Sequence, residues 1–163
     1  RSPGATTRFW PIIASVHHLN RSAADLFDPF YWDTYKLAVL NLAAAPGIDI
    51  LGHPAGYLPF PAALVEGTTY EQRLDLNREI ARRFLDRSWY EELARRAVRT
   101  GRAVEIHAPT RSPEPEMLRV LRRNGVRFSM GSDAHSLSRV GDVDWALDAL
   151  AQAGGGNRDL LEV

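Results

Sequence analysis

Residues 126–135 read VRFSMGSDAH, in which an apolar segment runs into a glycine, an aspartate and a histidine. The apolar part, residues 126–130, predicts a buried strand, and a polar turn and an amphipathic helix follow it. Side chains two positions apart in extended backbone point the same way, so Asp133 and His135 can converge on one cation. The alternative interpretation is that Asp133 caps the following turn and His135 is an ordinary loop residue.

Apolar runs and helical patterns alternate along the rest of the chain. Buried strands are expected at residues 9–16, 48–51 and 103–107, and a further strand is expected to begin at Leu160. Helices are expected at residues 30–45, 69–99 with a break near Arg87, 113–124 and 140–153. This order predicts an α/β fold with a parallel sheet, helices outside it and a ligand site at the carboxyl ends of the strands.

Polar residues are expected to begin the two helices within residues 69–99. Thr69 and Gln72 have the spacing of a capping box, in which each side chain bonds the other residue's backbone. Ser88 is a candidate cap of the second helix, with Glu91 three residues further on.

The composition restricts the class of protein. The chain has 163 residues, 45% of them apolar, which is enough for one domain with a core. Its 20 basic and 20 acidic residues give a net charge of zero, so nothing indicates a bulk attraction to nucleic acid or membrane. The absence of cysteine excludes disulfides and thiolate metal sites. No apolar run approaches the roughly 20 residues that span a bilayer, and residues 1–7 lack a signal-peptide core, so we expect a cytoplasmic protein.

The beginning of the chain is abrupt. It carries no initiator methionine, and within a few residues it enters an apolar strand candidate. We therefore expect residues 1–163 to be a single domain, or the carboxyl-terminal part of a larger one.

Every histidine of the chain stands at the carboxyl end of a predicted strand. They are His17, His18, His53, His107 and His135. Strand ends that share one rim of a parallel sheet would bring these imidazoles together with Asp133. Nitrogen and oxygen donors of this kind suit Zn²⁺, Mn²⁺ or Fe²⁺. A hydrogen-bonded structural role is the alternative for each histidine alone.

Four short motifs resemble, in the same order, the later motifs of the PHP (polymerase and histidinol phosphatase) family. They are ASVHH at residues 14–18, DILGHP at 49–54, VEIH at 104–107 and GSDAHS at 131–136. The resemblance covers roughly residues 9–150. It implies a distorted seven-stranded (β/α) barrel of the TIM-like kind, which holds up to three divalent metal ions at its carboxyl rim and hydrolyses phosphoester bonds.

The resemblance also implies roles for individual residues. His17, His53, Asp133 and His135 match positions of metal ligands, and Asp133 and His135 are the expected catalytic residues. Glu105 and His107 occupy an element that usually reads E-I-N; His107 departs from it, and both are expected to line the substrate pocket. The family's earlier ligands, an H-x-H strand, another histidine and a glutamate, do not precede His17. The barrel is therefore expected to be incomplete, and the chain to be either the carboxyl-terminal part of a full enzyme or a truncated relative.

The predicted function is a metal-dependent phosphomonoesterase that resembles histidinol phosphatase and uses a metal-activated water. Its substrate would be a small phosphorylated molecule. Arg139, four residues beyond His135, and Arg111 are the candidate phosphate contacts, although surface arginines would have the same pattern. Tyr57 and Phe60, in a proline-rich loop long enough for a lid or wall, could line the pocket or pack between helices.

Two other functions fit the same motifs. One is an exonuclease or proofreading module associated with a DNA polymerase, which would bind nucleic acid with strong salt dependence. The other is a noncatalytic scaffold that has kept the PHP fold without its chemistry. None of these functions calls for a membrane partner.

Overall fold

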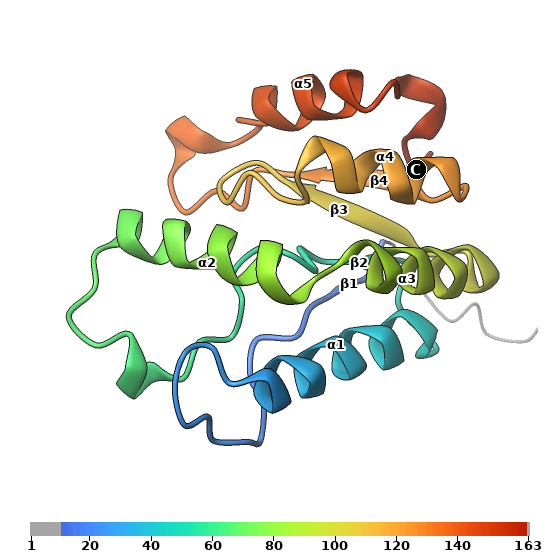
Figure 1. Ribbon diagram of the computed structural model, residues 1–163. Coiled ribbons are helices and arrows are strands. Elements are labelled where there is room, and N and C mark those ends of the chain that lie inside the picture. Colours follow the sequence, from blue (N-terminus) through green and yellow to red (C-terminus); the bar gives the residue numbers. More distant parts are fainter. Residues whose placement is uncertain (1–10, 163) are drawn as a thin grey trace, which may run out of the picture.

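The structure is a computed structural model that describes residues 11–162, and these residues form four parallel strands and five α-helices (Figure 1). The strands are β1 (Ile13–Ala14), β2 (Ile50–Leu51), β3 (Ala103–His107) and β4 (Arg127–Gly131). The helices are α1 (Pro29–Ala44), α2 (Tyr70–Phe84), α3 (Arg87–Thr100), α4 (Pro115–Arg123) and α5 (Asp144–Gln152). Short 3-10 helices lie at Ala62–Leu64, Leu137–Arg139 and Asn157–Asp159. The predicted α/β fold with a parallel sheet is confirmed.

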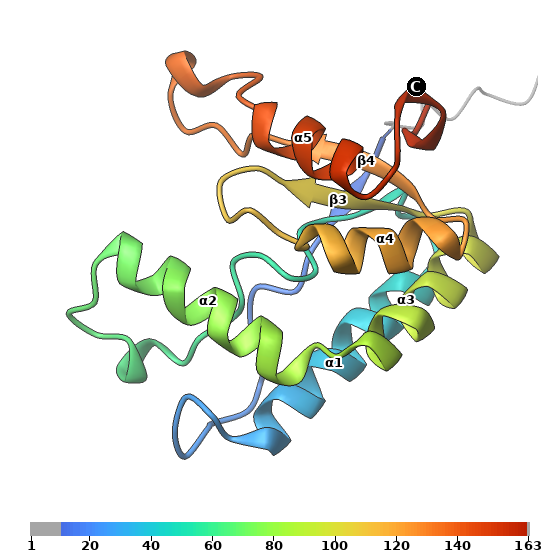
Figure 2. The same cartoon turned by 45° about the horizontal axis from the view of Figure 1, so that its top comes forward.

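The strands lie in the sheet in the order in which they occur along the chain, β1-β2-β3-β4. Crossovers between parallel strands are almost always right-handed, so a strand order that never reverses places the connecting helices on one face. Figures 1 and 2 show this arrangement, with α1, α3 and α4 in one layer beside the sheet. Such a half-shell is compatible with part of an α/β barrel.

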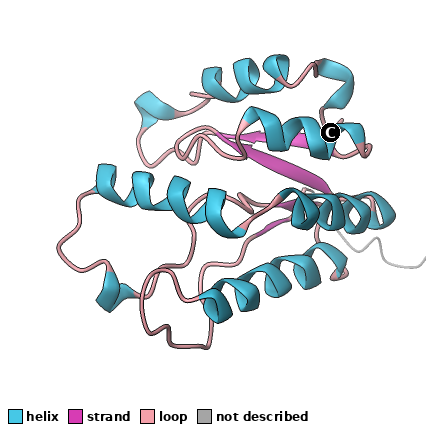
Figure 3. Ribbon diagram, viewed as in Figure 1, coloured by secondary structure: helices cyan, strands magenta, loops and turns pink. Residues whose placement is uncertain are grey.

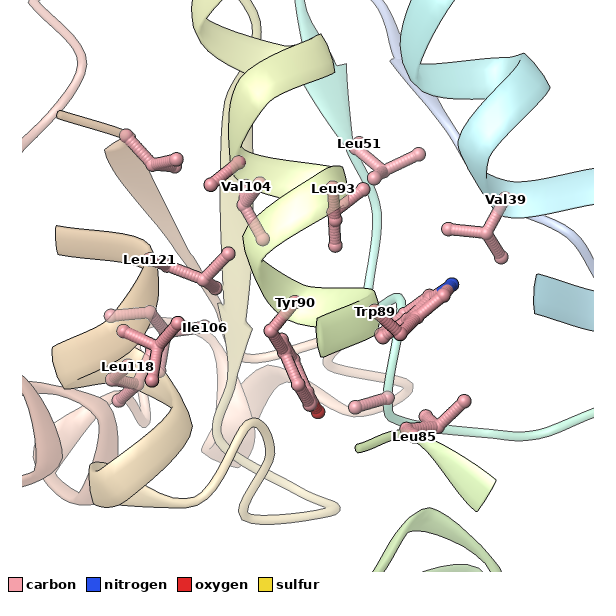
Figure 4. Close-up of a cluster of buried hydrophobic side chains, with 14 of the residues drawn as sticks. Val39, Leu51, Leu85, Trp89, Tyr90, Leu93, Val104, Ile106, Leu118 and Leu121 are labelled. Carbon is pink, nitrogen blue, oxygen red and sulfur yellow. The ribbon is translucent and has the colours of Figure 1, made fainter. Parts of the chain in front are cut away.

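The core lies between this helix layer and the sheet (Figure 4). Helix α3 packs between α1 and α4, and α5 packs beside α4. The even-numbered side chains of β3, Val104 and Ile106, are fully buried among α3 and α4 residues, which include Leu93, Leu118 and Leu121. Because side chains alternate along a strand, Glu105 and His107 point to the opposite face. One strand thus supplies both the core and the candidate site.

Most of the predicted elements lie where the sequence places them. Strand β3 has the predicted bounds, and β2 covers only the second half of the run at residues 48–51. The strand predicted at residues 9–16 is reduced to β1, and its first two residues lie outside the described part of the chain. At the other end, Leu160 forms a single parallel bridge with Phe128, which agrees with a further strand beginning there.

Of the two predicted helix caps, one is confirmed and the other is wrong. Thr69 and Gln72 form the predicted capping box, and α2 begins directly after Thr69. The prediction that Ser88 caps the next helix is wrong, because α3 begins at Arg87 and Asp86 accepts the hydrogen bond from the Trp89 amide. The Ser88 hydroxyl instead donates to the Asp86 carboxylate at 2.7 Å.

The loops that follow the carboxyl ends of the strands are much longer than the strands themselves (Figure 3). The candidate site residues predicted above lie at these ends or in these loops. Among residues 11–162 no helix combines the length and the apolar character needed to cross a bilayer.

The Asp86 cap gives the first testable prediction. Asp86→Ala should lower the free energy of unfolding by about 1 kcal/mol, because the Trp89 amide loses its acceptor. The hydrogen bonds from Ser88 and the Trp89 amide lower the pKa of Asp86. A carboxyl group with a lowered folded-state pKa stabilises the fold above its unfolded-state pKa of about 3.9, so the difference between parent and variant should shrink in more acidic solution.

Urea unfolding followed by circular dichroism, near neutral pH and at about pH 3, measures this difference. Ser88→Ala is the matched variant, since Ser88 was the cap expected from the sequence. It should cost less than Asp86→Ala at neutral pH. An equal loss for both, or a difference that persists in acid, would contradict the assignment of Asp86 as the cap.

Candidate functional site

The ends of the four strands bring together a row of side chains, which consists of His17, His53, His107, Asp133 and His135. The ring centroids of His17 and His53 lie 5.0 Å apart, and those of His53 and His107 lie 5.1 Å apart. Beyond His107, the Asp133 carboxylate has one oxygen 3.6 Å from His107 Nε2 and 3.8 Å from His135 Nε2. The residues predicted from separate strand ends are therefore neighbours along one rim of the sheet.

His53 is held from three directions. Its backbone amide donates to Glu105 Oε2 at 2.7 Å. Its Nδ1 lies 3.2 Å from the Gly56 carbonyl, and its Nε2 lies 3.2 Å from Ser15 Oγ. A carbonyl oxygen only accepts, so Nδ1 carries the proton and the lone pair is on Nε2. In this tautomer Nε2 accepts a hydrogen bond from the Ser15 hydroxyl, and a metal ion bound at Nε2 would replace that hydrogen bond.

Glu105 lies beneath the rim with only 7% of its surface exposed. Burial raises the pKa of its carboxyl group, while the hydrogen bond from the His53 amide opposes that shift. The carboxyl group fills space beside β4 that exists because residue 131 is glycine: a Cβ at Gly131 would lie 1.9 Å from Glu105 Oε1. The structure thus places Glu105 under the site as a support of His53. Its predicted contact with substrate stays a prediction.

His107 is fully buried at the end of β3. Its Nδ1 lies 2.7 Å from Thr110 Oγ1, and Thr110 Oγ1 lies 2.8 Å from Ser112 Oγ. The other ring nitrogen, Nε2, has no hydrogen-bond partner among the described residues. Gly56 packs against these three hydrogen-bonded side chains, and a Cβ at Gly56 would lie 2.3 Å from Thr110 Oγ1.

Asp133 and His135 are the more open members of the row. Asp133 has a positive φ of 41°, a left-handed conformation that aspartate tolerates better than most residues. Its side chain is 40% exposed and lies between His107 and His135. The His135 side chain is 87% exposed, so it is free to reorient.

The electrostatics of the row favour neutral imidazoles. Burial lowers the pKa of His17, and the nearby charge of His53 lowers it further. Burial likewise lowers the pKa of His53 and of His107, and the charge of His53 adds to the effect on His107. A neutral ring has a nitrogen lone pair to offer, which is the form that binds a metal ion.

The residues of the row fit a divalent cation chemically. Imidazole nitrogen and carboxylate oxygen are the donors that Zn²⁺, Mn²⁺ and Fe²⁺ take, and a buried imidazole nitrogen without a hydrogen-bond partner among the described residues lies beside a carboxylate. As placed, no three His, Asp or Glu side chains of residues 11–162 already form a group that could hold a metal ion. The four predicted ligands and His107 are the side chains that could gather around one.

A cavity of about 530 Å³ adjoins the row, and its lining includes His17 of the row and the neighbouring Tyr57. The Tyr57 ring lies 5.9 Å from that of His53 and 4.9 Å from that of His107. Phe60 lines the same cavity and also packs edge-on against Trp32 of α1, and its contact with a substrate stays a prediction. Arginine side chains at positions 21 and 73 give the cavity positive charge.

The cavity wall formed by the loop after β2 is held in place by hydrogen bonds from two helices. Tyr31 and Tyr35 of α1 donate from their hydroxyls to the Pro59 and Pro54 carbonyls. From α2, the buried Asn77 donates to the Ala55 carbonyl at 2.8 Å and accepts from the Leu58 amide at 2.9 Å. The loop lines the cavity and is anchored to both helices, and its role as a lid or a wall of a substrate site stays a prediction.

The two predicted phosphate contacts lie apart from each other. Arg139 pairs with Asp142 at 3.3 Å and is near enough to Tyr57 for its charge to oppose the raised pKa of that phenol. Arg111 is exposed, has a positive φ of 53° and lines a second cavity of about 280 Å³ between α2, α3 and α4. The structure brings Arg139 toward the row and turns Arg111 to another surface.

Sequence reasoning missed the hydroxyl groups around the histidines. Ser15 contacts His53, and Thr110 and Ser112 contact His107 or each other, yet none was singled out. A serine two residues before His17 and a T-x-S after the third strand were the available signals. Serine and threonine are so common in loops that these signals have little weight without the fold.

Comparison of the chain with models of protein families, with curated protein sequences and with solved structures finds no match. The interpretation of the site consequently depends on its own geometry and chemistry.

The contact between Gly131 and Glu105 gives the second prediction. Gly131→Ala should lower the free energy of unfolding by about 1–3 kcal/mol, because the new Cβ must displace the buried Glu105 carboxyl group. The displacement would also break the bond to the His53 amide. Thermal and urea unfolding of the purified variant measure the loss.

Gly156→Ala is the matched control, since its backbone is extended and a Cβ there meets nothing within 4 Å. It should retain the parent's stability. If Gly131→Ala is also as stable as the parent, the inference that Glu105 packs tightly against Gly131 is wrong.

Proposed function

We propose that this chain is a metal-dependent phosphoesterase that hydrolyses small phosphomonoesters, similar to histidinol phosphatases of the PHP family. The observation that carries the proposal is the row of His17, His53, His107, Asp133 and His135, which come from four neighbouring strand ends and lie beside one another. Ligand sites of parallel α/β folds lie at the carboxyl ends of the strands, which is where this row lies.

His17, His53, Asp133 and His135 would hold divalent ions such as Zn²⁺, Mn²⁺ or Fe²⁺, up to three in a complete site. When bound, such ions supply Lewis-acid stabilisation of phosphoryl oxygens and an activated water for attack on phosphorus. The chain's own residues orient the donors. The Gly56 carbonyl fixes the His53 ring, and Glu105 fixes the His53 backbone. Asp133 and His135 are the proposed catalytic residues.

The neighbouring cavity supports a small substrate. Its volume of about 530 Å³ is in the range of ordinary small-molecule sites. Tyr57 and Phe60 would contact the organic part of the phosphoester, and Arg139, beside the row, would contact its phosphate. An arginine binds phosphate oxygens through two parallel hydrogen bonds, which fixes the orientation of the ester.

We also propose that the half-shell of four strands belongs to a (β/α) barrel of the PHP type. The unbroken strand order and the single helix layer support this architecture. In the barrel that the resemblance implies, further strands carry the H-x-H, histidine and glutamate ligands.

The third prediction tests the function. His53→Ala and Asp133→Ala should each lower the turnover of p-nitrophenyl phosphate in the presence of Mn²⁺ by about a hundredfold or more, because each removes a ligand. The assay should use a protein that includes residues 1–163 and should compare initial rates at saturating substrate.

Asp148→Ala is the control for the loss of a carboxylate, since Asp148 is an exposed residue of α5 away from the row. It should retain the parent's turnover. Parent-like turnover in both His53→Ala and Asp133→Ala would rule out the catalytic interpretation.

A further inference from the structure

We infer that His107 is itself a metal ligand, which binds the ion through Nε2 together with Asp133. This inference rests on the proposed metal-dependent function and adds to it a ligand at the position where the PHP element E-I-N has asparagine. It makes the metal site of this chain a variant in which a fifth donor comes from β3.

The first argument is that His107 Nε2 is buried and has no hydrogen-bond partner among the described residues. His107 is completely buried, so bulk water does not reach Nε2, and no described residue hydrogen-bonds to it. Buried polar atoms in folded proteins nearly always have a partner, and an exception calls for a ligand or another specific reason. A cation at Nε2 would supply the missing partner.

The second argument is the distance to Asp133. The separation of 3.6 Å between His107 Nε2 and Asp133 Oδ2 is longer than an N–H···O hydrogen bond, which is about 2.7–3.2 Å. Two donors that bind one tetrahedral ion at about 2.0–2.1 Å lie about 3.4 Å apart. The observed spacing is thus closer to that of two ligands of one ion than to that of a hydrogen-bonded pair. His135 Nε2, 3.8 Å from the same oxygen, lies at a similar spacing.

The third argument is the protonation of the ring. Thr110 Oγ1 lies 2.7 Å from His107 Nδ1 and 2.8 Å from Ser112 Oγ. If Nδ1 donates to Thr110, the Thr110 hydroxyl can donate to Ser112, and the lone pair is left on Nε2. The Thr110 amide donates to Nδ1 at 3.4 Å in the tautomer that carries the proton on Nε2. Binding of a metal ion at Nε2 therefore moves the ring proton to Nδ1, where the Thr110 hydroxyl at 2.7 Å can accept it. The hydroxyl pair would act on the metal only through His107, as positioning residues.

A spectroscopic experiment tests this ligand directly. The chain has no cysteine, so in His107→Cys the only thiol stands at position 107. With Co²⁺, this variant should develop the near-ultraviolet thiolate-to-cobalt charge-transfer absorption that accompanies a Co²⁺–sulfur bond. Ser112→Cys is the matched control, because Ser112 is also buried but lies on the Nδ1 side of the ring. It should give no such band.

A titration covers the case in which the cysteine variant does not fold. His107→Gln keeps a side chain of similar length but removes the imidazole, and its affinity for Zn²⁺ in isothermal titration should fall at least about tenfold. His18→Gln removes an exposed imidazole that is not among the expected ligands and should keep the parent's affinity. Circular dichroism establishes that each variant is folded.

The outcomes separate the inference from the function on which it rests. Parent-like Zn²⁺ affinity in His107→Gln, or Co²⁺ bound by His107→Cys without the charge-transfer band, overturns the role of His107. If His53→Ala still weakens binding in that case, the proposed function stands. A parent protein that binds neither Zn²⁺ nor Co²⁺ overturns both.

Discussion

The hydrogen bond from the His53 amide to the buried Glu105 carboxylate joins the end of β2 to β3, and the rim depends on it. It is possible only because Gly131, on β4, leaves room for the carboxyl group. Three adjacent strands therefore meet at a single buried acid. A charged or polar side chain is costly to bury without a partner, so the backbone of His53 is fixed by the need to satisfy Glu105. The His53 ring is in turn oriented for the site.

Much of the fold could be predicted from the sequence, because local signals and tertiary packing agree there. The segment at residues 103–107 carries the β-branched Val104 and Ile106 and lies between Gly101 and Pro109, and β3 forms with the predicted bounds. The capping box at Thr69 satisfies backbone amides of α2 with no help from the rest of the molecule. Where a short segment contains its own stabilising contacts, its pattern is sufficient.

Other features could not be read from the sequence because competing residues lie too close together. Asp86 and Ser88 are both good caps, and two residues of difference in position is within the uncertainty of any helix start. The fold decides between them by giving the Trp89 amide to Asp86. The environment of the site residues could not be predicted from the sequence either. That each histidine lies at the end of a strand could be predicted from the sequence. That His107 is fully buried, with Thr110 on one nitrogen and no hydrogen-bond partner from residues 11–162 on the other, depends on packing from several elements.

The anchored loop after β2 has a consequence for selectivity. Asn77 hydrogen-bonds to this loop through both its side-chain nitrogen and its side-chain oxygen, and two tyrosine hydroxyls of α1 hydrogen-bond to other carbonyls of the loop. The loop backbone is therefore fixed before any molecule enters the cavity. If the small phosphoesters proposed above bind in this cavity, such a wall would select among them by size. A bulkier compound would fit only if several buried hydrogen bonds of the loop broke at once.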